Sequence, residues 1–232
     1  MPTEDELKLL AGQLAKPEGE LGLEVARDLH LTNFGMTQSA LRTLNLDRGD
    51  QILEIGHGNA AHLKFLLGLM SEISYTGLEI SETMQEEAKS LNSELAKEGM
   101  IRFCHYKGEL IPFSDSSFTK IFTVNTVYFW TNPKDFAAEI RRVLHPSGKF
   151  VLAFVQKEFM KELPFSKFGF KLYDTDDLID ILEKSEMIVE TAVNFEEMIQ
   201  TKSGQKMPRQ YTVLRCSAKK WGRTEHGQRG VH

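Results

Sequence analysis

Short apolar runs alternate with segments that read as helices along most of the chain. Runs rich in β-formers, of the kind that fill buried parallel strands, occupy residues 52–55, 73–79, 101–106, 120–125 and 149–156. The helical segments lie between or after these runs, at residues 61–70, 82–96, 133–144 and 175–185. This alternation predicts an α/β fold built on a mostly parallel sheet.

The two ends of the chain differ from this alternating middle. The first 45 residues read as helices over 4–14, 19–30 and 36–44, with breaks at 16–19 and 32–35. Two further strand-like runs, at 187–195 and 210–217, are separated by a polar connection at 196–209. We therefore expect a helical cap segment at 1–45, one domain at 46–218, and a mobile basic tail at 219–232.

The first strand ends in a loop with two glycines, Gly56-His57-Gly58-Asn59-Ala60. Glycines permit a sharp reversal and a close approach of the backbone to a ligand, so the loop reads as a nucleotide-binding turn. The spacing Gly56-x-Gly58-x-x-Ala61 also satisfies the dinucleotide fingerprint, and the acidic residue Glu79 follows 23 residues after Gly56. A nicotinamide-dependent oxidoreductase is therefore one interpretation.

Glu54 favours a different ligand. It lies two residues before Gly56, so its carboxylate is expected at the carboxyl end of the strand, where it would repel a pyrophosphate. A ligand with a sulfonium and an ammonium group, such as S-adenosylmethionine, would be attracted instead. Glu79 ends the second strand at the same edge of the sheet, where it can accept hydrogen bonds from both ribose hydroxyls.

Four ordered motifs resemble those of the class I S-adenosylmethionine-dependent methyltransferases, especially the small-molecule branch related to quinone-biosynthesis C-methyltransferases. They are Leu53-Glu54-Ile55-Gly56-His57-Gly58, the acidic Glu79, Ile111-Pro112-Phe113-Ser114-Asp115-Ser116-Ser117-Phe118, and Leu144-His145-Pro146-Ser147-Gly148. The resemblance covers residues 48–218. It implies a Rossmann-like, seven-stranded, mostly parallel sheet with helices on both faces, an antiparallel last strand and an N-terminal helical cap over the site.

The resemblance also implies S-adenosylmethionine as cofactor and assigns residues to it. Glu54, Gly56 and Gly58 would hold the methionine portion, and Glu79 would hold the ribose. Further cofactor contacts are implied at His57, Ile80, Lys107, Gly108, Glu109 and Asn125. Many relatives have an aspartate where this chain has Lys107, and an ammonium group has only donors. We therefore expect adenine to be recognised by the backbone near Gly108, by Glu109 or by apolar side chains.

Aromatic residues follow the fourth strand, where the resemblance places the methyl acceptor. Tyr128 and Trp130 are expected to contact the acceptor, as are Phe165, from a Phe-rich connection at 159–170, and Phe34 from the cap. Packing in the core is the competing interpretation for each of them.

Tyr128 and His145 are the candidates for a catalytic base if the acceptor is a hydroxyl. Asn125 to Tyr128 has the outline of the Asn-Pro-Pro-Tyr box of amino-methylating enzymes that act on nucleic acid, but both prolines are missing. No histidine has convincing metal-ligand spacing, and the fourth strand ends in Asn125 rather than an acidic ligand, so we expect no metal.

The composition of the chain limits the classes of partner and the cellular location that we expect. A formal net charge of −5 over 232 residues argues against nucleic acid as an obligatory partner. Cys104 and Cys216 are too few for a disulfide framework and read as reduced thiols. No signal peptide and no run of about 18 apolar residues, the length of a membrane span, is present. We expect a cytoplasmic monomer or homodimer.

The sequence thus predicts methyl transfer from S-adenosylmethionine to a small, aromatic or partly apolar acceptor. Two alternatives stay open: an NAD(P)-dependent oxidoreductase, and a protein that binds S-adenosylmethionine without catalysis.

Overall fold

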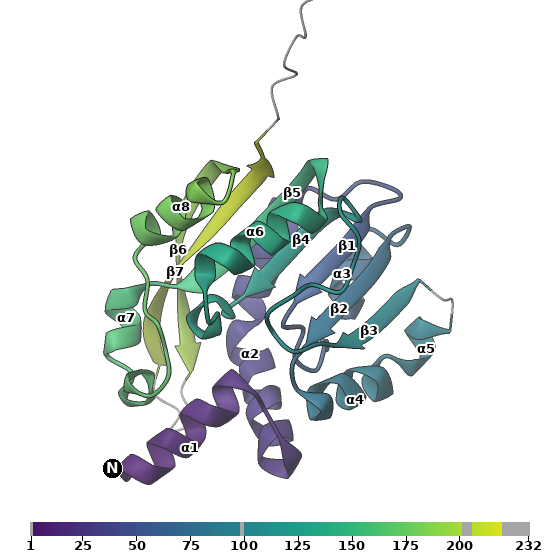
Figure 1. Cartoon of the computed structure of the whole chain (residues 1–232). Coiled ribbons are helices and arrows are strands. Elements are labelled where there is room, and N and C mark those ends of the chain that lie inside the picture. The colour runs from purple at the N-terminus through teal and green to yellow at the C-terminus, as the bar shows by residue number, and fades with distance from the viewer. Residues whose placement is uncertain (1, 98–99, 201–205, 220–232) are drawn as a thin grey trace, which may run out of the picture.

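The computed structural model describes residues 2–97, 100–200 and 206–219, and these form one sheet with helices on both faces (Figure 1). The strands are β1 (Gln51–Ile55), β2 (Ser74–Glu79), β3 (Ile101–His105), β4 (Phe118–Val124), β5 (Leu144–Val155), β6 (Met187–Gln200) and β7 (Lys206–Ala218). Their order in the sheet is β3-β2-β1-β4-β5-β7-β6. Only the pairings of β7 are antiparallel, so the predicted seven-stranded, mostly parallel sheet with an antiparallel last strand is confirmed.

Helices cover both faces of this sheet. They are α1 (Glu4–Ala15), α2 (Gly19–Leu44), α3 (Leu63–Leu69), α4 (Glu82–Leu91), α5 (Ser93–Ala96), α6 (Pro133–Val143), α7 (Lys157–Lys161) and α8 (Thr175–Lys184), with short 3₁₀ turns η1 (Val127–Phe129) and η2 (Pro164–Lys167). Helix α2 packs on β4, β5 and β7, whereas α6 and α8 pack against each other on the opposite face (Figure 1). Within the described ranges, no helix combines the length and apolar character needed to cross a bilayer.

The N-terminal helices differ from the prediction at one point. Residues 19–44 form a single helix of 26 residues, so the predicted break at 32–35 is wrong. The Thr32 hydroxyl donates to the Asp28 carbonyl within the helix, and Gly35 serves packing rather than a turn. The predicted helix 82–96 is instead divided at Asn92, whose side-chain amide donates to the carbonyls of Ala60 and Ala88.

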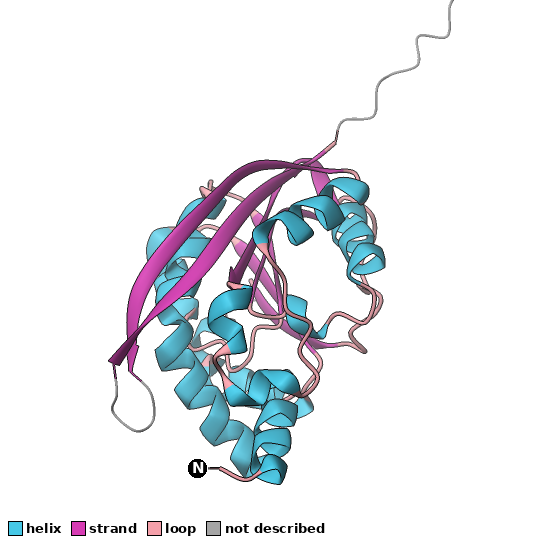
Figure 2. Ribbon diagram, turned by 90° about the vertical axis from the view of Figure 1, so that its left-hand side faces the viewer, coloured by secondary structure: helices cyan, strands magenta, loops and turns pink. Residues whose placement is uncertain are grey.

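The C-terminal strands are longer than predicted. Residues 196–209 were expected to connect them, but β6 continues to Gln200 and β7 begins at Lys206, with Glu197 opposite Arg209. Figure 2 shows this hairpin extending past the ends of the other strands. Residues 196–200 alternate in exposure, which is typical of a strand with only one covered face. The basic tail predicted at 219–232 lies outside the described residues except for Lys219.

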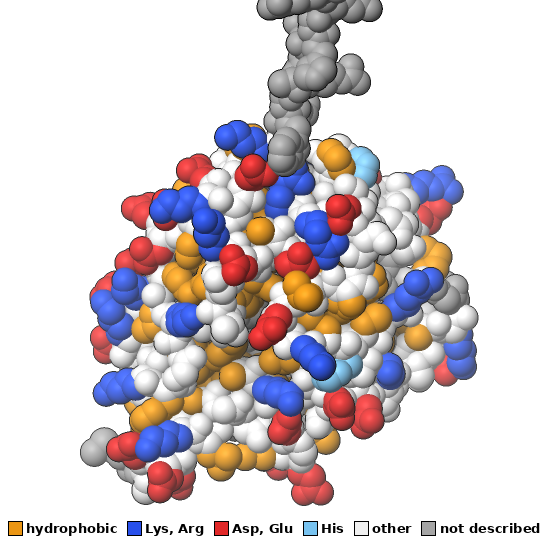
Figure 3. Space-filling model, in the orientation of Figure 1, with side chains coloured by type: hydrophobic (Ala, Val, Ile, Leu, Met, Phe, Trp, Pro, Cys, Tyr) orange, Lys and Arg blue, Asp and Glu red, His pale blue; other side chains and the backbone are white. Residues whose placement is uncertain are grey.

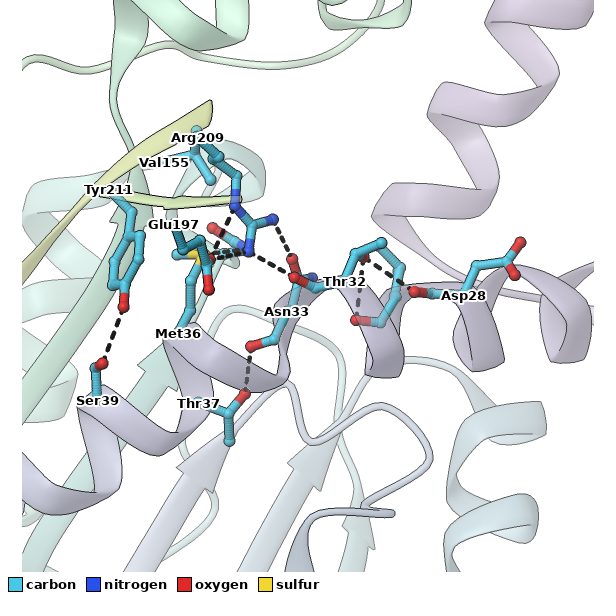
Figure 4. A network of polar contacts seen from close by, with 12 residues as sticks. Asp28, Thr32, Asn33, Met36, Thr37, Ser39, Val155, Glu197, Arg209 and Tyr211 are labelled. Atoms are coloured by element: carbon cyan, nitrogen blue, oxygen red, sulfur yellow. Dashed lines mark hydrogen bonds and ion pairs between the residues drawn. The ribbon is translucent and has the colours of Figure 1, made fainter. Parts of the chain in front are cut away.

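A buried ion pair holds the end of this hairpin on α2 (Figure 4). Arg209 is 5% exposed, and it donates to Asn33 Oδ1 at 2.8 Å and to the Thr32 carbonyl at 2.6 Å. Its Nε and Nη2 also donate to Oε1 of Glu197. Because a buried guanidinium is costly unless its N–H groups are bonded, these contacts are a condition of its burial. We call Arg209, Glu197, Thr32 and Asn33 the clasp.

Gly35 makes room for the clasp. A Cβ at this position would come within 2.1 Å of Oε2 of Glu197, so the carboxylate lies directly against the helix backbone. A glycine inside a helix costs about 1 kcal/mol relative to alanine. A second contact lies two residues along β7, where the Tyr211 and Ser39 hydroxyls are 2.9 Å apart (Figure 4). The hairpin therefore docks on α2 at successive points.

We expect Arg209→Met to lower the free energy of unfolding by about 3 kcal/mol, because it leaves the Glu197 carboxylate without its partner. Urea denaturation measures this loss, and faster amide hydrogen exchange at residues 195–200 and 206–211 would locate it. Arg215→Met is the matched control. Arg215 also bridges β7 to a glutamate on β6, Glu190 at 3.1 Å, but its side chain is 34% exposed, so about 1 kcal/mol or less is expected. Equal losses in both variants would contradict a special role for the clasp.

Candidate cofactor and acceptor site

A cavity of about 910 Å³ opens at the carboxyl ends of β1, β2, β4 and β5. Its walls include the glycine loop, Glu79, Asn125 and η1, and it is closed from the other side by parts of α1, α2, α7 and the β6–β7 hairpin. On the face seen in Figure 3, apolar side chains gather in a hollowed band between the regions of α1 and α6. The cavity lies where ligands bind in open α/β sheets.

The glycine loop has a backbone that only glycine adopts easily. Gly56 and Gly58 have φ values of +75° and +54°. A Cβ at Gly56 would come within 2.4 Å of Cγ2 of Thr126, so that glycine is needed for close packing against the segment after β4. Apart from the two chain neighbours, no described residue has an atom within 4 Å of a Cβ placed at Gly58. The space beside Gly58 is therefore open to a ligand.

Glu79 ties the loop to the end of β2. It is 5% exposed, and its carboxylate accepts from the backbone N–H of Gly58 at 2.9 Å on one oxygen and from those of Ile80 and Ser81 at 2.8 and 3.0 Å on the other. A carboxylate has about four lone-pair sites, so about one is left for a ligand. Contact with both ribose hydroxyls therefore requires one backbone bond to be exchanged, and it stays a prediction.

Glu54 lines the cavity from β1 and is 3% exposed. Its Oε2 accepts from Nε2 of His62 at 2.8 Å and from the Tyr75 hydroxyl. Since a carboxylate oxygen only accepts, His62 carries its proton on Nε2. The sequence interpretation missed both partners, because they lie 8 and 21 residues away and neither belongs to a recognised motif.

His57 lines the cavity but faces the sheet. Its Nδ1 donates to the Gly58 carbonyl at 2.7 Å, and Nε2 has no hydrogen-bond partner within the described part of the chain. Burial lowers the pKa of His57, so the ring is neutral near pH 7. The ring lies against Gly77, where a Cβ would come within 2.5 Å of it, and is tilted on Phe103. These contacts shape the loop.

Four further predicted cofactor contacts divide into two groups. Ile80 and Gly108 line the cavity and lie against each other. Lys107 and Glu109 are exposed and do not line it, so they are not supported as cofactor contacts. Tyr106, which the sequence interpretation missed, does line the cavity, and burial raises its pKa. The part of the cavity that would hold adenine is therefore mainly apolar, and backbone groups and the Tyr106 hydroxyl lie beside it.

The structure argues against both candidate catalytic bases, Tyr128 and His145. Tyr128 lines the cavity, but its hydroxyl accepts from the Val155 N–H at 2.6 Å and also contacts the Val155 carbonyl and Asn125 Oδ1. Burial raises its pKa far above the ordinary value, so the phenol does not act as a base near neutral pH. His145 is exposed in the irregular amino end of β5, before Lys149, and Lys149 itself is about 20 Å along the strand from the cavity end at Val155.

Asn125, predicted as a cofactor contact, lines the cavity in the left-handed conformation, with φ +59°. Its Oδ1 lies 3.2 Å from the Tyr128 hydroxyl, so the bend after β4 is held by a side-chain bond. Asparagine is among the few residues that tolerate this conformation. The bend carries the chain into η1 and brings Trp130 to the cavity.

Of the predicted acceptor contacts, Tyr128, Trp130 and Phe165 line the cavity. Phe34 does not, because its ring packs edge-on against Phe65 of α3 at 5.7 Å. It is half-buried and lies outside the hydrophobic core, so neither interpretation of Phe34 is borne out. The sequence interpretation missed many apolar wall residues. These are Leu10 and Leu14 of α1, Leu29 of α2, and Met198, Ile199 and Met207 of the hairpin. The Phe-rich connection named in the sequence analysis also lines the cavity, at Phe159, Met160, Leu163 and Phe170, as does Phe129 after β4.

His30 is a further missed residue. It lines the cavity from α2, and burial lowers its pKa, so its imidazole is neutral and able to accept a proton. The sequence did not single out His30, because it only continues the apolar pattern of the helix in which it lies and belongs to no motif. Among the described residues, no three His, Cys, Asp or Glu side chains are grouped to hold a metal ion.

Comparison with known proteins finds similar methyltransferases. Residues 53–152 match a family model described as a methyltransferase domain. The chain is 26% identical over 126 residues to the uncharacterised methyltransferase YdaC of Bacillus subtilis, covering 54% of this chain and 67% of that protein. It is also 26% identical over 137 residues to the phthiotriol/phenolphthiotriol dimycocerosates methyltransferase of Mycobacterium tuberculosis, covering 59% of this chain and 49% of that protein. The matches therefore span about half to two thirds of these relatives.

Solved structures share the fold. Geranyl diphosphate C-methyltransferase from Streptomyces coelicolor, in complex with Mg²⁺, geranyl diphosphate and S-adenosyl-L-homocysteine, superposes with a TM-score of 0.66 at 13% identity. The superposition covers 89% of this chain and 87% of that one.

Gly58→Ala tests whether a ligand occupies the open space beside the loop. We expect it to weaken S-adenosylhomocysteine at least about tenfold by calorimetry, or about 1.4 kcal/mol, while lowering the free energy of unfolding by only about 1–2 kcal/mol for the left-handed backbone. Gly49→Ala is the matched control, since Gly49 has φ +84°, has nothing within 4 Å of its Cβ position and does not line the cavity. Equal affinities in the two variants would show that the cofactor binds elsewhere.

Proposed function

We propose that this chain, a member of the class I S-adenosylmethionine-dependent methyltransferases, methylates a small acceptor with an apolar, aromatic-sized body. The observation that carries the proposal is the division of one cavity into two parts. Glu54, Glu79 and the open backbone at Gly58 form a polar part, and the residues after β4 and β5 form an apolar part beside it. Such a cavity suits a cationic cofactor and an apolar partner together.

The polar part would hold the cofactor. Glu54 would face the methionine ammonium, the Gly56 and Gly58 backbone would lie along the methionine portion, and Glu79 would bind the ribose. Ile80 and Gly108 would enclose adenine. When bound, the cofactor supplies an electrophilic methyl group. The open space at Gly58 and the two carboxylates fit this ligand.

The apolar part would orient the acceptor and exclude water. Trp130, Phe165, Phe129 and Phe170 would surround its body, and the rings of the last two are 4.7 Å apart. Orientation and loss of water are what a transfer between two bound molecules needs from the protein. His30, being neutral, would accept a proton if the acceptor atom carries one.

Two similar proteins support a small-molecule acceptor. Their names refer to phthiotriol or phenolphthiotriol dimycocerosates and to geranyl diphosphate, which are not macromolecules. The net charge of −5 likewise argues against nucleic acid. A cytoplasmic location and a monomeric or dimeric state remain predictions.

The oxidoreductase alternative is disfavoured by charge. A dinucleotide would bring a pyrophosphate to a loop flanked by Glu54 and Glu79, and the described lining of the cavity has one Lys or Arg side chain, Arg209, which is already paired with Glu197. Like charges brought together in a buried site repel strongly. Binding without catalysis is separated from the proposal by an acceptor screen.

Thermal-shift measurements with S-adenosylmethionine, S-adenosylhomocysteine and NAD test the cofactor. We expect the first two to raise the melting temperature and NAD to leave it unchanged. Glu79→Gln should reduce both shifts, because it loses charge-assisted bonds of roughly 1.5–3 kcal/mol each. Stabilisation by NAD alone would favour the oxidoreductase.

Phe165→Ala tests the acceptor part. With an acceptor identified from a panel of phenols, quinols and thiols, we expect methyl transfer to fall about tenfold, since a side chain that buries the acceptor is lost, while calorimetric affinity for S-adenosylhomocysteine is unchanged. Phe168→Ala is the control, because Phe168 lies three residues away and outside the cavity lining. If both variants keep full activity, the acceptor does not contact this segment. If no acceptor in the panel is methylated by the wild type, binding without catalysis is favoured.

A further inference from the structure

Three buried side chains meet at one carboxylate beside the glycine loop. Glu54 of β1, Tyr75 of β2 and His62, just before α3, are 3%, 1% and 7% exposed. Both hydrogen bonds go to the same oxygen of Glu54, Oε2, from Nε2 of His62 at 2.8 Å and from the Tyr75 hydroxyl. Oε1 has no hydrogen-bond partner among the residues that the structure describes.

This one-sided bonding fixes the carboxylate. Two donors from different elements remove the free rotation of the group about its last bond, and so determine where Oε1 lies. Tyr75 is a reliable donor because burial, together with the negative charge of Glu54, raises the pKa of its phenol. His62 is held in turn by packing, since its ring stands edge-on to Phe122 at 6.3 Å.

Satisfying a buried carboxylate does not by itself explain the arrangement. Donors that served only to satisfy the carboxylate would be expected on both oxygens. Glu79 shows this pattern, because one of its oxygens accepts from the Gly58 N–H and the other accepts from those of Ile80 and Ser81. On Glu54 the oxygen left without a donor belongs to a residue that lines the cavity. An acceptor in that position is available to a donor from a ligand.

We propose that His62 and Tyr75 are positioning residues that aim Oε1 of Glu54 at the ammonium group of the cofactor. The inference rests on the proposed contact between Glu54 and the methionine portion. It adds that the contact depends on side chains that need not touch the cofactor, and that the methionine portion, not the nucleoside, is the part they control.

The test uses two probes that differ in this portion. S-adenosylhomocysteine carries the ammonium group, and 5′-methylthioadenosine keeps the adenine, ribose and sulfur but lacks the amino acid. By calorimetry, His62→Leu and Tyr75→Phe should each weaken S-adenosylhomocysteine about tenfold, the usual effect of removing a supporting hydrogen bond. Both should leave 5′-methylthioadenosine within about twofold, which a merely structural loss would not do.

Two further variants complete the design. His62→Gln retains an N–H donor of similar reach and should restore most of the affinity, which also covers the case in which His62→Leu does not fold. In a Glu54→Gln background, His62→Leu should change the affinity less than about twofold, since the carboxylate it positions is absent.

The possible outcomes are distinct. Equal weakening of both probes, or an undiminished effect of His62→Leu beside Glu54→Gln, would overturn the positioning role. Unchanged affinity for both probes in the single variants would overturn it too. Failure of the wild type to bind either probe would instead reject the cofactor site on which the proposal rests.

Discussion

The carboxylate of Glu79 is the contact on which the site depends. Its backbone partners belong to two different crossings: Gly58 to the turn after β1, and Ile80 and Ser81 to the turn after β2. Parallel strands place both turns at one edge, but they do not fix the distance between them. One side chain bridges them, and the N–H groups of the left-handed residues Gly56, Gly58 and Ala60 are all bonded, to Leu78, Glu79 and His57.

This arrangement was partly predictable because its parts are local. A β-former run, two closely spaced glycines and an acidic residue at the end of the next strand are visible in the sequence, and parallel pairing brings them together. The conformation of Asn125 was not visible in the same way. The left-handed bend after β4 is held by Tyr128, and the hydroxyl of Tyr128 is held by Val155, 27 residues further along the chain.

Contacts between residues far apart in the sequence explain the other errors of the sequence interpretation. Residues 196–209 are polar and charged, so they read as a connection, yet Arg209 is buried by acceptors on α2 that lie 176 and 177 residues away. Gly35 was taken as a break for the same reason, since a glycine that makes room for Glu197 looks like a glycine in a turn. Phe34 and Phe165 have the same chemistry, and only their surroundings in the fold separate them, since Phe34 packs on Phe65 outside the cavity and Phe165 lines it.

The two parts of the cavity differ in what holds them rigid. Glu54 and Glu79 are fixed by buried side chains and backbone amides at the ends of the central strands, so the polar part is tied to the centre of the sheet. The acceptor part is built from short elements, α7 and η2, and from a hairpin that reaches past the sheet and is held there by the clasp. Under the proposed function, the cofactor contacts would therefore belong to the central strands, and the choice of acceptor would belong to the outer elements.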